Sequence, residues 1–169
     1  YLLDGMVYVN VHTAANPSGE IRGQVVGLEL PPIVKPPTGA LGSDFDVTIT
    51  NLTTGAPGEG GQVFSPLLLA THDQKVHLFQ VGTPASNELR ILAEDGNPVP
   101  LANLATSLGG VMDVLALDAP LPPGASVTKR IKGSVDARLL SFASMLVETN
   151  AGFAGADGIL LLGDNGEPR

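Results

Sequence analysis

The sequence predicts a mainly all-β protein: an antiparallel β-sandwich with one or two short helices in its connections, preceded by an N-terminal β-hairpin. Three observations lead to this prediction. The 169-residue chain contains 21 glycines and 14 prolines, which favours many turns over long helices. Several segments alternate apolar and polar residues with the period of a strand. Hydrophobic residues make up 43% of the chain but aromatic residues only 4%, so the predicted core is aliphatic.

The first predicted element is a hairpin within residues 1–30. Apolar residues alternate with polar ones on both sides of an Asn-Pro-Ser-Gly turn, which gives the hairpin one apolar face. A two-stranded hairpin alone is at best marginally stable in water, so this face needs a covering surface. We place Val7, Val9, Val11, Ile21 and Val25 on this apolar face, through which the hairpin could assemble with another surface.

A proline- and glycine-rich linker is predicted over residues 31–44. Its proline-rich half should be extended, at about 3.1 Å per residue, and could carry the hairpin away from the next domain or along that domain's edge. The sandwich is predicted over 45–163, and a polar tail over 164–169.

The strands of the sandwich follow from local patterns. Phe45, Val47 and Ile49 alternate with polar residues, which predicts a strand with these three side chains facing inward. The continuous apolar run at 65–73 predicts a strand covered on both faces, and 75–81 is a further strand or a turn. The remaining predicted strands are 111–117, 126–132, 139–147 and 158–163.

Helical spacing interrupts the strands once or twice. Thr83 followed by Pro84 is a typical N-cap and first helical position, and the apolar residues after them repeat with a helical period. This pattern predicts a helix over 85–95 that ends at Gly96. A second short helix is predicted at 101–108.

Composition excludes some functions and leaves others open. The net charge is −8 with a pI of about 4.6, and the nine basic residues are scattered, so no basic stripe for nucleic acid is present. The chain has no cysteine, hence no disulfide or thiolate metal site. No apolar run approaches the ~20 residues of a membrane span. The chain begins at Tyr1 rather than at a methionine, so we expect a mature form or a fragment.

Motifs for catalysis are weak. The histidines His12, His72 and His77 show no HxH or HExxH spacing, and we interpret them as surface or hydrogen-bonded residues rather than metal ligands. No serine lies in a GxSxG turn. Glu94 and Asp95 are adjacent and therefore point apart at a helix end. A hydrolase or redox enzyme would require His72 or His77 to meet a second imidazole in space.

The segment 148–158 is polar and rich in glycine, and it is predicted as a loop between two apolar strands. It offers oxygen ligands from Glu148, Thr149, Asn150 and Asp157. Calcium requires 6–8 oxygens at 2.3–2.6 Å, and such a loop could supply several of them. The alternative is an ordinary interstrand loop in which Asn and Asp serve the turn geometry.

Two resemblances emerge from these motifs. The ordered segments FDVTITNLTTG, SPLLLATHD, LFQVGTPASNELRILAEDGNPVPL, LPPGASVTKRIK and LLSFASMLVETNAGFAGADGILLL, spanning residues 45 to about 162, resemble the spondin N-terminal domain family. The opening LLDGMVYVNVHTAANPSGEIRGQV resembles the end of a CHRD domain, the module named for chordin, in which the corresponding segments form a closing hairpin.

The resemblance to the spondin family implies an antiparallel, C2-like sandwich with one calcium site at its end. It also implies a secreted, non-enzymatic adhesion or matrix module rather than a catalyst. Within this chain it points to Asp157 and Asn150 as calcium ligands, with Glu94 as a weaker third. The family often has an acidic residue after the Asn, where this chain has Ala151, and the loss of a carboxylate weakens a calcium site.

The implied location is extracellular, and the expected partner is a protein or glycan of the matrix or cell surface, or a second copy of the protein itself. No nucleic acid and no membrane span are expected. The alternative function is a self-assembling filament subunit, in which the hairpin adds strands to a neighbouring copy. The hairpin could instead fold back on its own sandwich, or pack on missing upstream sequence.

Overall fold

The structure is a computed structural model, and it separates the chain into two compact units, Tyr1–Ile33 and Val34–Arg169. Each unit is described by itself. The residues that the structure describes are 8–11, 21–24, 42–56 and 59–162.

The first unit contains the predicted hairpin. Strands β1 (Tyr8–Val11) and β2 (Ile21–Gln24) pair antiparallel in a two-stranded sheet. The register places Val11 opposite Ile21, so the strand pairing expected from the sequence is confirmed. Val7 and Val25, expected on the apolar face, lie outside the described residues.

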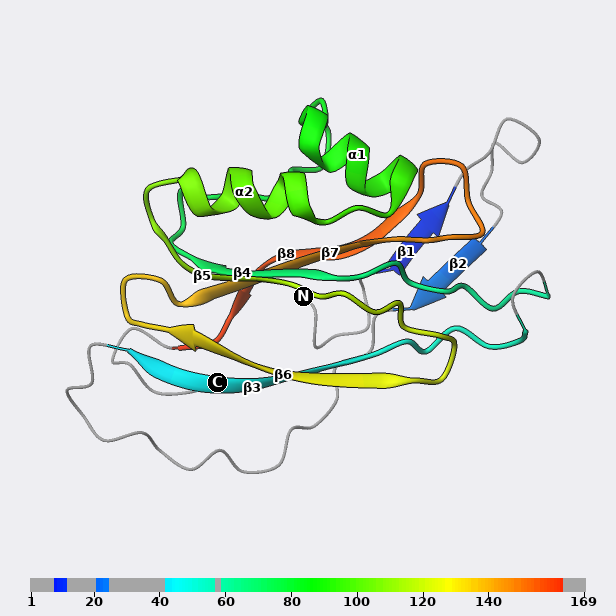
Figure 1. Ribbon diagram of the computed structural model, residues 1–169, viewed down its shortest axis with the longest axis horizontal. Coiled ribbons are helices and arrows are strands. Elements are labelled where there is room, and N and C mark those ends of the chain that lie inside the picture. Colours follow the sequence, from blue (N-terminus) through cyan, green and yellow to red (C-terminus); the bar gives the residue numbers. More distant parts are fainter. Residues whose placement is uncertain (1–7, 12–20, 25–41, 57–58, 163–169) are drawn as a thin grey trace. The chain divides into compact units, whose positions relative to one another are not determined.

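The second unit is an antiparallel β-sandwich with two helices, as the sequence predicts. One sheet has the strand order β3-β6, and the other has the order β5-β4-β7-β8. Figure 1 shows both helices on one face of the larger sheet and the β3–β6 pair on its opposite face. The elements are β3 (Ser43–Thr50), β4 (Leu68–His72), α1 (Asn87–Asp95), α2 (Val99–Ser107), β5 (Val111–Ala116), β6 (Ser126–Gly133), β7 (Leu139–Met145) and β8 (Phe153–Leu160).

Strand β4 lies at the centre of this arrangement. All five of its residues are buried, which confirms that the apolar run of the sequence is a strand covered on both faces. On one face it joins an aliphatic cluster with the helices, and on the other the Thr71 hydroxyl donates to the Lys132 carbonyl at 2.5 Å. The buried residues of the helix-side cluster are Leu68, Ala70, Leu78, Leu89, Leu92, Leu101, Ala105 and Ala143.

Strands β3 and β6 pair along their whole length. Their outer face is polar: Asp46 is opposite Arg130, and the Thr48 and Thr128 hydroxyls are 2.8 Å apart. Their inner face carries the apolar residues predicted for β3, and these remain half-buried because β3 is an edge strand. Strand β3 begins at Ser43, so the predicted linker, which ended at residue 44, is too long at this end.

The first helix begins at Asn87, two residues later than predicted, and its N-cap lies three residues later than predicted. Ser86, not Thr83, is the N-cap, and its hydroxyl accepts the Leu89 N–H at 3.1 Å. Both positions carry a hydroxyl, and only the residue whose side chain reaches the first helical turn can cap it. Gly96 ends the helix in the left-handed region at φ 65°, as predicted.

The sequence left residues 75–81 open as a strand or a turn. They form neither helix nor strand, so the turn alternative is correct. The second helix runs from Val99 to Ser107, whereas the sequence predicted 101–108. Strand β8 begins at Phe153, whereas the sequence predicted a loop up to residue 158. The glycines at 155 and 158 suggested a loop, but cross-strand pairing with β7 overrides that local preference.

Candidate functional site

The correction at β8 changes the surroundings of Asp157. Leu140 pairs with Ile159 and Phe142 with Ala156, so Ser141 on β7 faces both Asp157 and Gly158. This two-against-one pairing is a β-bulge, which re-aims side chains at a sheet edge. Gly158 has φ 83°, in the region that L side chains avoid, and therefore permits the bulge.

The bulge joins two histidines in one hydrogen-bond network. Nε2 of His72 lies 2.6 Å from the Ser141 hydroxyl, which lies 3.0 Å from Oδ1 of Asp157. The other carboxylate oxygen, Oδ2, lies 2.5 Å from Nδ1 of His77. The Leu78 backbone N–H donates to Oδ1 at 3.0 Å. We call His72, Ser141, Asp157 and His77 the four-residue network.

Hydrogen-bond chemistry fixes most of the donors in this network. Nδ1 of His72 donates to the Asp73 carbonyl at 2.7 Å, because a carbonyl can only accept. The Gly158 N–H donates to the Ser141 oxygen at 2.9 Å. Ser141 has a single hydroxyl hydrogen, which can serve either His72 or Asp157 but not both at once. His72 and Asp157 are therefore coupled through Ser141.

The network does not have the arrangement of a hydrolase triad. In a triad the histidine lies between the serine and the carboxylate, so that it can take the proton of an exposed hydroxyl. Here Ser141 lies between His72 and Asp157, and both Ser141 and His72 have 0% exposed surface. A substrate cannot reach this hydroxyl without unfolding the strands around it, so the buried part of the network is a structural support.

His77 is the exposed end of the network. Its side chain is 41% exposed, whereas that of Asp157 is 14% exposed. An ionised carboxylate only accepts, so Nδ1 of His77 donates its hydrogen to Asp157. His77 lines a cavity of about 410 Å³ together with Phe79, Ser86, Leu89 and Phe153.

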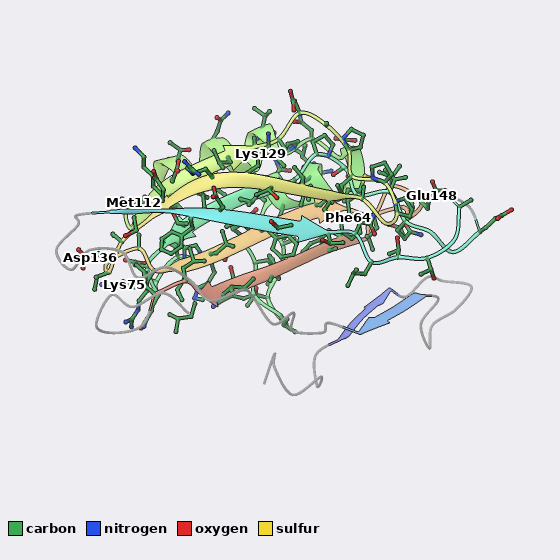
Figure 2. All side chains as sticks on the ribbon, turned by 90° about the horizontal axis from the view of Figure 1, so that it is seen from below. Phe64, Lys75, Met112, Lys129, Asp136 and Glu148 are labelled. Atoms are coloured by element: carbon green, nitrogen blue, oxygen red, sulfur yellow. The ribbon has the colours of Figure 1, made fainter. Side chains whose placement is uncertain are left out.

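The three expected calcium ligands lie on different elements. Asn150 is exposed in the turn after β7, and Glu94 is exposed on α1, where it forms an ion pair with Arg90 at 2.5 Å. Asp157 lies four strand residues beyond Phe153, about 13 Å along β8 from the end that carries this turn. Figure 2 places Glu148 of the turn at one end of the sandwich and Lys75, two residues before His77, at the other.

The structure therefore does not bring Asn150, Glu94 and Asp157 together as one set of calcium ligands. Within residues 42–56 and 59–162, no three His, Cys, Asp or Glu side chains are grouped to hold a metal ion. Both oxygens of Asp157 already accept hydrogen bonds from the protein. Calcium binding therefore stays a prediction that a direct measurement must test.

Comparison with protein families supports the resemblance seen in the sequence. The Spondin_N family model matches residues 56–164, more than half of the chain. The chain belongs to the Spondin_N family. The CHRD domain model matches residues 1–25, which contain the hairpin. Both families are known as extracellular, matrix-type modules. A search of curated proteins found no match, and no helix in the described parts of the chain could span a membrane.

The sequence alone missed the network of this Spondin_N domain. His72 lies in an apolar run that is buried on both faces, and a buried imidazole requires hydrogen-bond partners. That burial was the available signal, and it favours the hydrogen-bonded interpretation of His72, whereas His12 lies outside the described residues. The partner was hidden because Ser141 is 69 residues away, and only the pairing of β4 with β7 brings the two strands together.

Proposed function

We propose that this Spondin_N chain is an extracellular adhesion or matrix module that acts by binding rather than by catalysis. The match of the Spondin_N model to residues 56–164 carries the proposal, because that family is a matrix-type module. The inaccessible Ser141 and His72 support it, since their hydrogen bonds stabilise the fold and no substrate can reach them. The partner is a protein or glycan of the matrix or cell surface.

Two measurements test this proposal. The first is fractionation of cells that produce the protein, which should place it in the secreted or surface-bound fraction. The second is surface plasmon resonance of the full chain against panels of matrix proteins and glycans, with a heat-unfolded sample as the control. Recovery from the cytoplasm alone would refute the location, and turnover of a substrate by the purified chain would refute the non-catalytic role.

The proposal includes a calcium ion that stabilises the sandwich. It is supported by the family resemblance and by the oxygen-rich turn at Glu148–Asn150. Terbium luminescence and thermal unfolding in calcium and in EDTA would test it on the full chain. A calcium-dependent rise in the melting temperature that is lost in Asp157→Asn and kept in Glu59→Gln, an exposed acid in another loop, would support the site. Identical melting curves in calcium and EDTA would remove it.

Self-assembly through the hairpin is a second candidate function. It is favoured by the separate two-stranded β1–β2 sheet, because such a sheet is marginal unless another surface covers it. Strand addition to an exposed sheet edge is a known way to cover such a surface. Sedimentation velocity of the full chain should then show concentration-dependent assembly, which Val9→Glu with Val11→Glu abolishes. A full chain that stays monomeric at all concentrations would exclude this function.

A further inference from the structure

We propose that the outer edge of strand β8 accepts the β1–β2 hairpin of a second copy of this chain, so that the copies join head to tail. The acceptor is the stretch Phe153–Ala156 at the start of β8, which we call the acceptor edge. The inference rests on self-assembly, the second candidate function, and names the surface that takes part in it.

The acceptor edge directs backbone groups away from the sheet. Strand β8 is the last in the order β5-β4-β7-β8, and among the described strands none pairs with its outer side. The Leu146 N–H donates to the Gly152 carbonyl at 2.9 Å, which makes these two residues a hydrogen-bonded pair. Bonded and non-bonded pairs alternate along an antiparallel ladder, so Phe153 and Gly155 direct their N–H and C=O groups outward. An added strand can bond these groups.

The acceptor edge also lacks the charges that protect the other edges of the sandwich. Charged side chains on an edge strand oppose the addition of another strand. Strands β3 and β6 carry exposed charges at Asp44, Asp46, Lys129, Arg130 and Lys132. At the opposite edge of the larger sheet, Asp113 on β5 accepts the Lys132 backbone N–H at 2.9 Å, which ties β5 to β6. The charged residue of β8, Asp157, turns into the four-residue network and is 14% exposed.

Apolar surface lies beside the acceptor edge, on the side of the sheet that the helices cover. A Cβ on Gly155 would lie 3.0 Å from the Phe79 ring, and this ring meets that of Phe153 with centroids 5.0 Å apart. Both rings line the cavity of about 410 Å³ that also contains His77. Val81 in the same lining is 99% exposed. A strand added about 4.8 Å from β8 would direct every second side chain to this surface.

Strand β1 of the hairpin matches the acceptor edge. It has four residues and no charged one, whereas β2 contains Arg22. Alternation along the sequence of β1 puts Val9 and Val11 on one face, which would cover the apolar surface beside β8. A two-stranded sheet alone is marginal in water, and this contact would supply the surface that it needs.

The positions of the two attachment points favour a second copy over the same chain. The hairpin is joined to the sandwich at Ser43, which pairs with Gly133 beside the turn that contains Asp136. The acceptor edge follows the turn that contains Glu148, and Figure 2 places Asp136 and Glu148 at opposite ends of the sandwich. A donor attached at one end and an acceptor at the other form a head-to-tail contact that does not close. Residues 25–42 join β2 to β3 and can span up to about 60 Å, enough to reach a neighbour.

Sedimentation velocity of two variants of the full chain tests the acceptor edge. Val9→Glu with Val11→Glu disables the donor strand. Ala154→Lys places a charge on the acceptor edge, where an added strand would remove its water without supplying a partner. Each variant alone should stay monomeric at concentrations at which the unaltered chain assembles. An equimolar mixture should form dimers and nothing larger, because one working donor and one working acceptor remain. Thr48→Lys on the edge strand β3, the matched control, should assemble as the unaltered chain does.

The outcomes separate this inference from the function on which it rests. An unaltered chain that stays monomeric at all concentrations would remove self-assembly and the acceptor edge together. Assembly that Ala154→Lys leaves unchanged would keep self-assembly and overturn the acceptor edge alone. Loss of assembly in Thr48→Lys with none in Ala154→Lys would move the acceptor to β3.

Cross-linking decides the matter if circular dichroism shows that Ala154→Lys does not fold. The chain has no cysteine, so each introduced thiol reports one position. A bismaleimide should join Asn10→Cys chains to Ala154→Cys chains and should not join them to Thr48→Cys chains. A link that forms only within one chain carrying both Asn10→Cys and Ala154→Cys would show the hairpin folded on its own sandwich, and would overturn the inference.

Discussion

Replacing Ser141 by alanine tests whether the four-residue network supports the fold. The hydroxyl contacts three groups: Nε2 of His72 at 2.6 Å, Oδ1 of Asp157 at 3.0 Å and the Gly158 N–H at 2.9 Å. Ser141 and His72 have no exposed surface, so water cannot take the place of the hydroxyl. Ser141→Ala should therefore destabilise the sandwich far more than the loss of one surface hydroxyl.

The expected magnitude follows from the groups that lose their partners. A buried donor or acceptor left unsatisfied costs about 1–3 kcal/mol. Ser141→Ala leaves Nε2 of His72 and the Gly158 N–H without the hydroxyl that they bond. Asp157 keeps its hydrogen bonds from His77 and from the Leu78 N–H. The predicted loss is about 2–6 kcal/mol, a large part of the roughly 5–15 kcal/mol that stabilises a typical domain.

Urea unfolding of the full chain, followed by circular dichroism, measures this loss. The midpoint should fall with little change in the m-value, because the folded surface is unchanged. The matched control is Ser126→Ala on β6, whose hydroxyl bonds Thr50 at 2.8 Å on the exposed outer face, and which should lose less than about 1 kcal/mol. A loss at Ser141 no larger than that at Ser126 would refute the reasoning.

A double-mutant cycle separates the hydrogen bond from general packing. When both partners of a buried bond become apolar, much of the penalty disappears. His72→Leu combined with Ser141→Ala should therefore lose less stability than the sum of the two single variants. Strict additivity would show that His72 and Ser141 are not coupled.

Three further predictions concern other parts of the sandwich. The hydrogen bond from Arg130 lowers the pKa of the Asp46 carboxyl below its ordinary 3.8, so the stability that the pair contributes above that pH is lost as the pH falls through the lowered pKa. In urea unfolding at several pH values, Asp46→Asn should reduce this loss of stability in acid, and an unchanged pH profile would contradict the prediction. Asn51→Ala should lower the free energy of unfolding in urea by at least about 2 kcal/mol, because the buried Asn51 amide donates to the Gln62 and Leu121 carbonyls at 2.6 and 2.9 Å. A near-neutral result would mean that these carbonyls find other partners. Gly158→Ala should cost about 1–2 kcal/mol through backbone strain at φ 83°. A steric clash adds nothing to this cost, because the nearest atom to the new Cβ is 3.9 Å away. Unchanged stability would mean that the bulge rearranges freely.

The sequence predicted the fold where local patterns and tertiary packing agree. The alternation in β3 and the apolar run containing β4 specify their own burial, and the structure bears out both. Gly96 ended its helix as predicted because the left-handed cap is a local requirement. Errors arose where two local signals compete, as between Thr83 and Ser86 for the N-cap of α1.

The candidate site was less predictable because it depends on pairing between distant strands. His77 and Asp157 are 80 residues apart, and no spacing rule links them. Gly158 suggested a loop, whereas in the structure it permits a bulge that turns Asp157 toward Ser141 and His77. A residue selected from the sequence as a metal ligand thus occupies a position where protein donors take both of its oxygens.

Asp157 links the calcium proposal to the four-residue network, and the network supplies a test of the proposal. A calcium ion bound by Asp157 would have to replace protein donors around that carboxylate, because it needs oxygen ligands at about 2.3–2.6 Å. Losing the contact to Asp157 would release the His77 ring from its hydrogen bond. Calcium should therefore shift the ¹⁵N signals of the His77 ring in NMR spectra of the full chain if Asp157 is a ligand. Unchanged His77 signals at saturating calcium would place any calcium away from Asp157, with the turn at Glu148–Asn150 as the next position to examine by substitution.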